Sequence, residues 1–229
     1  MKLYSVYAFI QRNRHYCFLV YAAVYVVWFH FLERTVTRGP QFHVVHCAAD
    51  EMIPFIPLFI IPYLLWFAYV GAALVVLDYK DADEATHLGI FLACGMTICL
   101  MIFTFFPNGT DFRIIANPDN GICSALTWLI QRIDPPTNVF PSIHVYNSMG
   151  VNDAIWRSRL FKNYPVIRWG SLILMVLICF STVFLKQHSL LDVAGAMILA
   201  YFMDKAIYGK LLPAYVPLTK KKKLTQTAH

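Results

Sequence analysis

The chain has 229 residues, of which 59% are hydrophobic and 14% are charged. This composition excludes an ordinary soluble domain, in which about a quarter of the residues are charged. The formal net charge of +6 does not indicate a nucleic-acid partner, because the basic residues flank apolar segments or gather in a tail over residues 209–229. We therefore predict a single, all-α, polytopic integral membrane domain over residues 1–229.

Six apolar segments are candidates for crossing a bilayer, which takes about 20 helical residues. In chain order they cover residues 17–32, 53–77, 88–106, 143–156, 169–185 and 189–208. The fourth is short and holds Asn147 and Asn152, while the sixth carries Asp192 and Asp204. Prolines at positions 54, 57 and 62 are expected to bend or irregularise the second helix. The predicted fold is a bundle of six transmembrane helices.

The distribution of basic residues predicts the orientation of this bundle. Of the 19 Lys and Arg residues, 14 lie on one side of the six spans and 5 on the other. The basic side is expected to stay cytoplasmic, which places both termini in the cytoplasm, most simply at the cell membrane. The two short motifs described below then lie on the extracytoplasmic face.

The longest outer loop covers residues 107–141. Asp119 or Asn120 can cap a short helix in this loop, and apolar residues at 122, 126, 129, 130 and 133 follow helical spacing. We predict that this helix lies in the membrane interface, with ordinary packing against the bundle as the alternative.

The six cysteines have no metal-ligand spacing, and we expect neither a metal nor another cofactor. Cys47 and Cys123 fall in loops on the same predicted side of the membrane. We expect two free thiols there rather than a disulfide.

Two histidines and a carboxylate stand where apolar segments begin, namely His144, His188 and Asp192. Residues four apart lie on one face of a helix, so Asp192 can hold an imidazole nitrogen of His188. The second histidine then supplies an acid beside a nucleophile. This set of groups is enough to displace an alcohol from a phosphoryl group through a covalent intermediate.

Three further residues are candidates for binding a phosphate group. Ser142 opens the fourth span, where free backbone amides attract anions, and Arg113 and Lys186 flank the segments that hold the histidines. Two cations near one point would repel a divalent metal ion, so a metal site is disfavoured. A transporter would place polar groups near mid-bilayer, and contacts between helices are the purely structural alternative. The combined spacing favours a catalytic site.

At these residues the chain resembles the type 2 phosphatidic acid phosphatase superfamily of integral membrane enzymes. The motifs of that superfamily are written KxxxxxxRP, PSGH and SRxxxxxHxxxD. Residues 141–144, with the sequence PSIH, are similar to the second motif, and residues 181–192 keep the spacing of the third. The similarity in pattern covers about residues 107–203.

Several positions depart from these motifs. Ile143 replaces the glycine of the second motif, and Thr182 replaces the arginine of the third. Arg113 can stand for the arginine of the first motif, but an isoleucine follows it and Phe106 occupies the lysine position. Lys186, two residues before the histidine of the third motif, is a candidate to replace the missing charge.

The resemblance implies a lipid phosphatase that hydrolyses a phosphomonoester or diphosphate of a lipid through a phosphohistidine, without a metal. By this resemblance His188 attacks phosphorus, Asp192 orients it and His144 protonates the leaving oxygen. The loosened motifs are also similar to the inositol phosphorylceramide and sphingomyelin synthases, which transfer a lipid headgroup to an alcohol. A transporter and an inactive scaffold are weaker alternatives. The expected partners are a lipid phosphate and membrane lipids, with no nucleic acid and no obligate protein partner.

Overall fold

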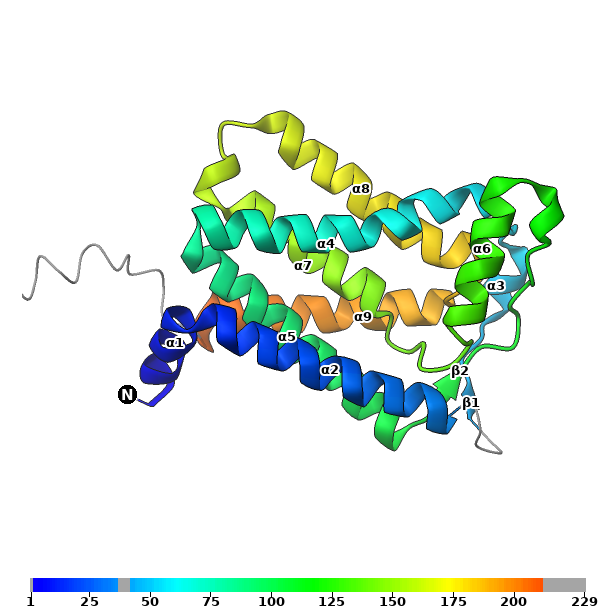
Figure 1. Cartoon of the computed structure of the whole chain (residues 1–229), viewed down its shortest axis with the longest axis horizontal. Coiled ribbons are helices and arrows are strands. Elements are labelled where there is room, and N and C mark those ends of the chain that lie inside the picture. Colours follow the sequence, from blue (N-terminus) through cyan, green and yellow to red (C-terminus); the bar gives the residue numbers. More distant parts are fainter. Residues whose placement is uncertain (1, 37–41, 212–229) are drawn as a thin grey trace, which may run out of the picture.

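The computed structural model describes residues 2–36 and 42–211, and most of these residues are helical. The helices are α1 (Lys2–Arg12), α2 (Arg14–Val36), α3 (Ala48–Met52), α4 (Ile60–Lys80), α5 (Ala82–Phe105), α6 (Ile122–Ile133), α7 (Ile143–Arg157), α8 (Pro165–Phe184) and α9 (Leu190–Asp204), which a π-helical segment (Lys205–Leu211) continues. Two short strands, β1 (His43–Val44) and β2 (Asn108–Gly109), pair in parallel. Figure 1 shows the long helices lying along the longest axis of the molecule, with α3, α6 and both strands gathered at one end.

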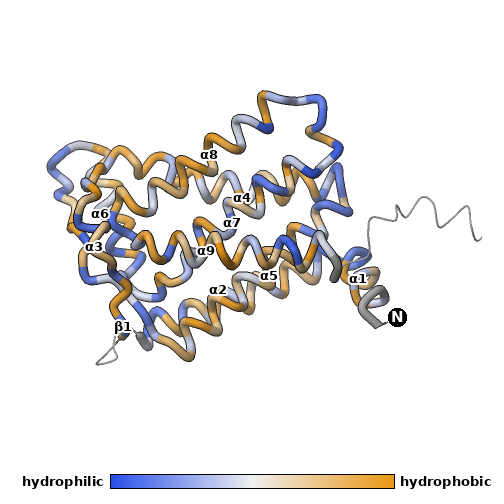
Figure 2. The backbone as a smooth tube through the Cα atoms, turned by 180° about the vertical axis from the view of Figure 1, so that it is seen from behind, coloured by the Kyte–Doolittle hydropathy of each residue, from blue (hydrophilic) through white to orange (hydrophobic). Residues whose placement is uncertain are grey.

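Four helices in the described part of the chain are long and apolar enough to cross a membrane. They cover Arg14–Thr35, Pro57–Lys80, Ala82–Phe105 and Pro165–Phe184. These helices confirm the first, second, third and fifth predicted segments. Apolar side chains on the outside of α2, such as Leu19 and Val27, are exposed, and Figure 2 shows hydrophobic residues along the long helices with hydrophilic ones towards their ends. The chain is an all-α membrane protein.

The fourth and sixth predicted segments form α7 and α9, which are 15 residues long each. α7 lies in the middle of the bundle, where it packs against α4, α5, α8 and α9. Gly95 of α5 permits this packing, because a Cβ atom at that position would lie 1.9 Å from the ring of Tyr146 on α7. The hydroxyl of Tyr146 also donates to the backbone carbonyl of Phe91, at 2.8 Å. The N-termini of α7 and α9 both face the end of the bundle that holds α6.

The predicted start of the second span at residue 53 is wrong, since α4 begins at Ile60. Pro57 opens a 3₁₀ turn, Pro57–Phe59, directly before α4. Pro62 is the third residue of α4, where a helix leaves backbone amides without partners in any case. The prolines therefore shape the entrance of α4 and interrupt no hydrogen bond in its middle.

The predicted cap of α6 is also wrong. Its N-cap is Gly121, whose φ of 96° suits glycine. Asp119 and Asn120 lie instead in a 3₁₀ turn, Pro118–Asn120, because the side chain of Asn117 accepts a hydrogen bond from the Asp119 amide at 3.0 Å.

Candidate active site

His188 lies in the tight turn between α8 and α9. Lys186 in this turn has a φ of 57°, in the left-handed region that commonly ends a helix. The backbone amides of Gln187 and His188 both donate to the carbonyl of Thr182, at 3.0 Å each. This pair of hydrogen bonds fixes the backbone of His188 against the last turn of α8.

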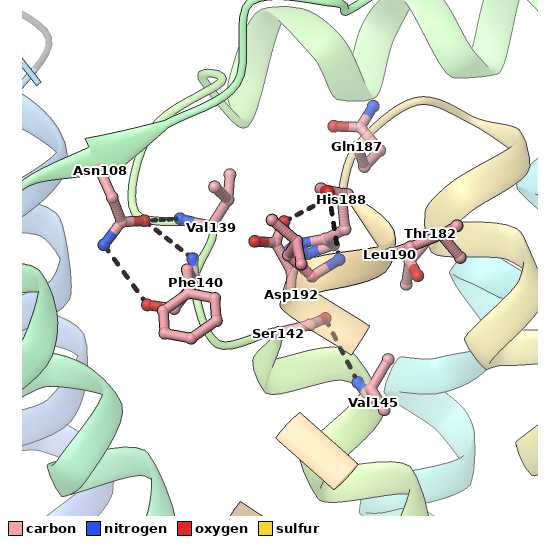
Figure 3. Close-up of polar contacts among 12 residues, drawn as sticks. Asn108, Val139, Phe140, Ser142, Val145, Thr182, Gln187, His188, Leu190 and Asp192 are labelled. Atoms are coloured by element: carbon pink, nitrogen blue, oxygen red, sulfur yellow. Dashed lines mark hydrogen bonds and ion pairs between the residues drawn. The ribbon is translucent and has the colours of Figure 1, made fainter. Parts of the chain in front are cut away.

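A buried carboxylate orients the imidazole of His188. Asp192, which is fully buried, places Oδ2 3.2 Å from Nδ1 of His188 and accepts the Ser189 backbone amide at 2.9 Å. The Ser189 side chain in turn caps α9, and Figure 3 shows Asp192 beside His188. Because a carboxylate only accepts hydrogen bonds, Nδ1 of His188 carries the proton and Nε2 keeps its lone pair.

His144, the second residue of α7, lies beside His188. The centres of the two imidazole rings are 5.8 Å apart, with their planes at 62°. Tyr63 and Trp66 of α4 pack against the ring of His144, at centroid distances of 4.6 and 4.4 Å. The structure therefore brings the two histidines of the predicted site together.

The loop before α7 is held by Asn108 of β2, whose side chain is completely buried. Its Oδ1 accepts the backbone amides of Val139 and Phe140, at 2.9 and 2.8 Å, as Figure 3 shows. Its Nδ2 donates to the carbonyls of Phe106 and Phe140, at 2.9 and 3.3 Å. The start of α7 is joined to α9 as well, because the Ser142 amide donates to the carbonyl of Asp192 at 3.2 Å.

Arg113 reaches the same region from the long loop after α5. Its guanidinium donates to the backbone carbonyl of Asp134 at 2.6 Å and to the side-chain oxygen of Gln187. The Asp134 carboxylate accepts the hydroxyl of Tyr63 at 3.1 Å. Burial raises the pKa of Asp134, although Arg113, His188 and the Tyr63 hydrogen bond oppose this rise. Burial likewise lowers the pKa of Arg113.

These side chains surround a cavity of about 380 Å³. His144, His188, Arg113 and Gln187 line it, together with residues of α2, α4 and the 130–139 segment. Several buried polar atoms in its wall have no hydrogen-bond partner among the described residues, and these are Nε of Arg113, Nε2 of Gln187, Oγ1 of Thr137 and both amide atoms of Asn138. A polar ligand in the cavity would find these groups ready to bind.

Four of the six predicted site residues line or support the cavity, whereas Ser142 and Lys186 do not line it. His144, His188 and Arg113 line the cavity, and Asp192 supports His188 from behind. Ser142 is completely buried, and its Oγ caps α7 by accepting the Val145 amide at 3.5 Å.

Lys186 departs from its predicted role in phosphate contact. Its side chain is buried, and Nζ donates to the backbone carbonyl of Asp50 at 2.5 Å. The left-handed conformation of its backbone directs the side chain to α3 rather than into the cavity. Thr182, at the position of the motif arginine, is buried too, and its hydroxyl donates to the carbonyl of Cys179 at 2.8 Å.

Asp50 supports the site although no sequence motif includes it. Its carboxylate accepts the Ser189 hydroxyl at 2.5 Å, the Leu190 amide at 2.8 Å and the Cys47 amide at 2.9 Å. Burial is the largest single influence on the pKa of Asp50 and raises it, but the hydrogen bonds together outweigh burial and lower the pKa. Acidic residues are common near helix N-termini, where they interact favourably with the helix dipole, so no sequence signal connects Asp50 with α9.

Asp134, Asn108 and Gln187 are likewise outside the predicted set of site residues. Gln187 directly precedes His188 and could have been found by its position alone. The six cysteines are free thiols. Within the described ranges, no cluster of three or more His, Cys, Asp or Glu side chains could hold a metal ion.

Comparisons with protein-family models, with curated proteins and with solved structures find no match for this chain. Its function therefore has to be inferred from the residues described above.

Proposed function

We propose that the protein is a membrane-embedded lipid phosphatase that cleaves a phosphomonoester or diphosphate of a lipid through a phosphohistidine at His188. One observation carries this proposal. The imidazole of His188, held by Asp192 at 3.2 Å, faces His144 across a cavity that also receives the guanidinium of Arg113. A nucleophile, an acid and an anion-binding group thus share one space, without any need for a metal or cofactor.

The chemical steps follow from these positions. Nε2 of His188 forms a bond to phosphorus as the bond from phosphorus to the lipid oxygen breaks, and His144 gives a proton to that oxygen. Arg113 and the unpartnered side-chain NH2 groups of Gln187 and Asn138 donate hydrogen bonds to the phosphoryl oxygens as charge shifts between them. A water molecule then gives a proton back to His144, attacks phosphorus and releases phosphate, which restores His188.

The proposed placement in the cell membrane has six spans, with both termini cytoplasmic and the cavity on the extracytoplasmic side. α7 and α9 would be the two short spans, each about 22 Å long at 1.5 Å per residue. The position of α7 among other helices supports this arrangement, because its polar residues then avoid lipid. Exposed apolar residues on α6, including Ile122, Leu129 and Ile133, support an interfacial position for that helix.

A second function is favoured by the charges around the cavity. Of the described residues, Arg113 is the only Lys or Arg that lines it, whereas Glu33 and Asp134 add two carboxylates. A phosphomonoester carries up to two negative charges, but a phosphodiester carries one and is opposed less by these groups. The alternative is therefore transfer of a headgroup from a phosphodiester lipid to a lipid alcohol, by the same histidines.

The first test measures phosphate release from phosphatidic acid and from a polyprenyl diphosphate by purified protein in detergent with EDTA. We expect release that falls at least about a thousandfold in His188→Ala and stays unchanged in His43→Ala, which alters an exposed histidine on β1 that does not line the cavity. Transfer of a headgroup to diacylglycerol or ceramide, without phosphate release, would select the second function. Folded protein that does neither would contradict both and favour a transporter or an inactive scaffold.

A further inference from the structure

A second cavity, of about 520 Å³, lies beside the first. Its walls come mainly from three helices, with Leu19, Ala22 and Val26 on α2, Val70 and Leu74 on α4, and Leu92 on α5, and Asn147 of α7 adds one polar side chain. We call this space the α2–α4 groove. It exists because α2 packs mainly on α5, which leaves room between α2 and α4. Nearly all of its lining side chains are apolar.

The groove adjoins the catalytic cavity. Tyr25 of α2 and Trp66 of α4 line both spaces. Trp66 also packs on the ring of His144, at 4.4 Å between centroids. A molecule that places a phosphoryl group beside His188 can therefore extend past Trp66 into the groove without leaving the protein.

Charged residues close the far end of the groove. Asp78 and His15 line it there, and their side chains are 3.0 Å apart. Arg14 also binds the Asp78 carboxylate, at 2.5 Å. An apolar chain gains nothing by passing this cluster, because the charged groups would lose their contacts with water and with one another.

The length of the groove follows from α4. Trp66 and Asp78 are twelve residues apart, which corresponds to roughly 18 Å of helix. Carbon–carbon bonds of about 1.5 Å advance an extended hydrocarbon by roughly 1.3 Å per methylene. The groove therefore suits a chain of roughly 14 carbons.

We infer that the α2–α4 groove binds one hydrocarbon chain of the lipid whose phosphate enters the catalytic cavity, and that its charged end sets the preferred chain length. The inference rests on the proposed function, because it takes the lipid phosphate as the ligand of the cavity. The adjacency of a cavity with polar groups and an apolar groove, which share Tyr25 and Trp66 in their walls, supports it, since an amphiphile can fill both at once. The groove belongs to helices that are long and apolar enough to cross a membrane, so a chain can enter from the bilayer.

The first experiment measures kcat/KM for alkyl phosphates of 8 to 18 carbons. In the wild type we expect kcat/KM to rise up to about 14 carbons and then to level. Ala22→Phe fills the groove and should lower kcat/KM for tetradecyl phosphate roughly tenfold, with little change for octyl phosphate. Ala23→Phe is the matched control, because Ala23 is also exposed on α2 but does not line the groove. Equal losses in both variants, or equal losses at all chain lengths, would overturn the inference.

A second experiment does not depend on turnover. Tetradecyl phosphate with a diazirine at the chain end is cross-linked to the His188→Ala protein, and the labelled residues are mapped by mass spectrometry. We expect labels near Leu74 and Leu19, competed by unlabelled tetradecyl phosphate and reduced by the added Ala22→Phe change. Labels confined to the outer surface, as at Val27, would overturn the inference. If the groove is labelled but the wild-type protein releases no phosphate in the first test, the result would contradict the proposed function alone.

Discussion

Replacement of Asp50 by asparagine tests how α3 supports the turn that holds His188. The carboxylate accepts three hydrogen bonds in a buried setting, from the Ser189 hydroxyl and from the amides of Leu190 and Cys47. Asparagine has one acceptor oxygen, so at least one buried amide loses its partner, which costs about 1–3 kcal/mol. The remaining hydrogen bonds also become weaker, because their acceptor is no longer charged. We expect Asp50→Asn to lower the free energy of unfolding by about 3 kcal/mol.

The assay is thermal unfolding of purified protein in detergent, followed by tryptophan fluorescence. In a protein of this size, about 3 kcal/mol corresponds to a fall in Tm of roughly 6–12 °C. Glu51→Gln is the control, because the Glu51 side chain is 74% exposed and Nε2 of His46 lies 3.8 Å from its carboxylate. Equal Tm values for the two variants would refute the role assigned to Asp50.

The pH dependence gives an independent check on Asp50. Its pKa in the folded protein lies below the ordinary value of 3.8, so the charged form is bound more tightly in the folded state. The stabilisation it provides is complete above the unfolded pKa and is lost as the pH falls through the folded pKa. The Tm difference between wild type and Asp50→Asn should therefore stay constant from about pH 5 to 8 and narrow below about pH 4. A difference that widens in acid would contradict this sign.

Three more substitutions test other parts of the structure. Asn108→Ala leaves two buried amides of the loop before α7 without acceptors, and we expect a loss of about 2–4 kcal/mol in the free energy of unfolding. Gly95→Ala forces a Cβ atom into the ring that packs on it and should cost about 1–3 kcal/mol, whereas Gly71→Ala meets no atom within 4 Å and should not lower Tm. Lys186→Met should change kcat/KM for phosphatidic acid by less than about threefold, because its ammonium group binds a backbone carbonyl; a hundredfold loss, typical of a removed transition-state contact, would show that it binds phosphate.

The sequence predicts the long helices well, because apolar length alone decides whether a segment can cross a bilayer. It also predicts the contact between His188 and Asp192, which needs only the four-residue spacing of a helix and its cap. Both features depend on residues that are close in the chain. The approach of His144 to His188 is consistent with the prediction that α7 and α9 both begin on the same side of the bundle.

What the sequence could not predict depends on residues that are far apart in the chain. Asp134 and Arg113 come together only because α6 folds back over the cavity, and no local pattern marks Asp134. The direction of Lys186 depends on a single left-handed φ angle, which turns its side chain away from the cavity. A lysine seldom signals such a conformation, since glycine is the usual residue at that point of a helix end.

The hydrogen bond between Asp50 and Ser189 spans 139 positions of the chain. A ribosome adds about 5–20 residues per second, so Asp50 is made roughly 7–28 s before its partner. During that interval α9 has not been made, so Asp50 of α3 lacks its contact with Ser189. The earlier helices can already pack against one another. We expect the turn between α8 and α9 to be among the last parts of the protein to reach its final shape, once α9 has been made.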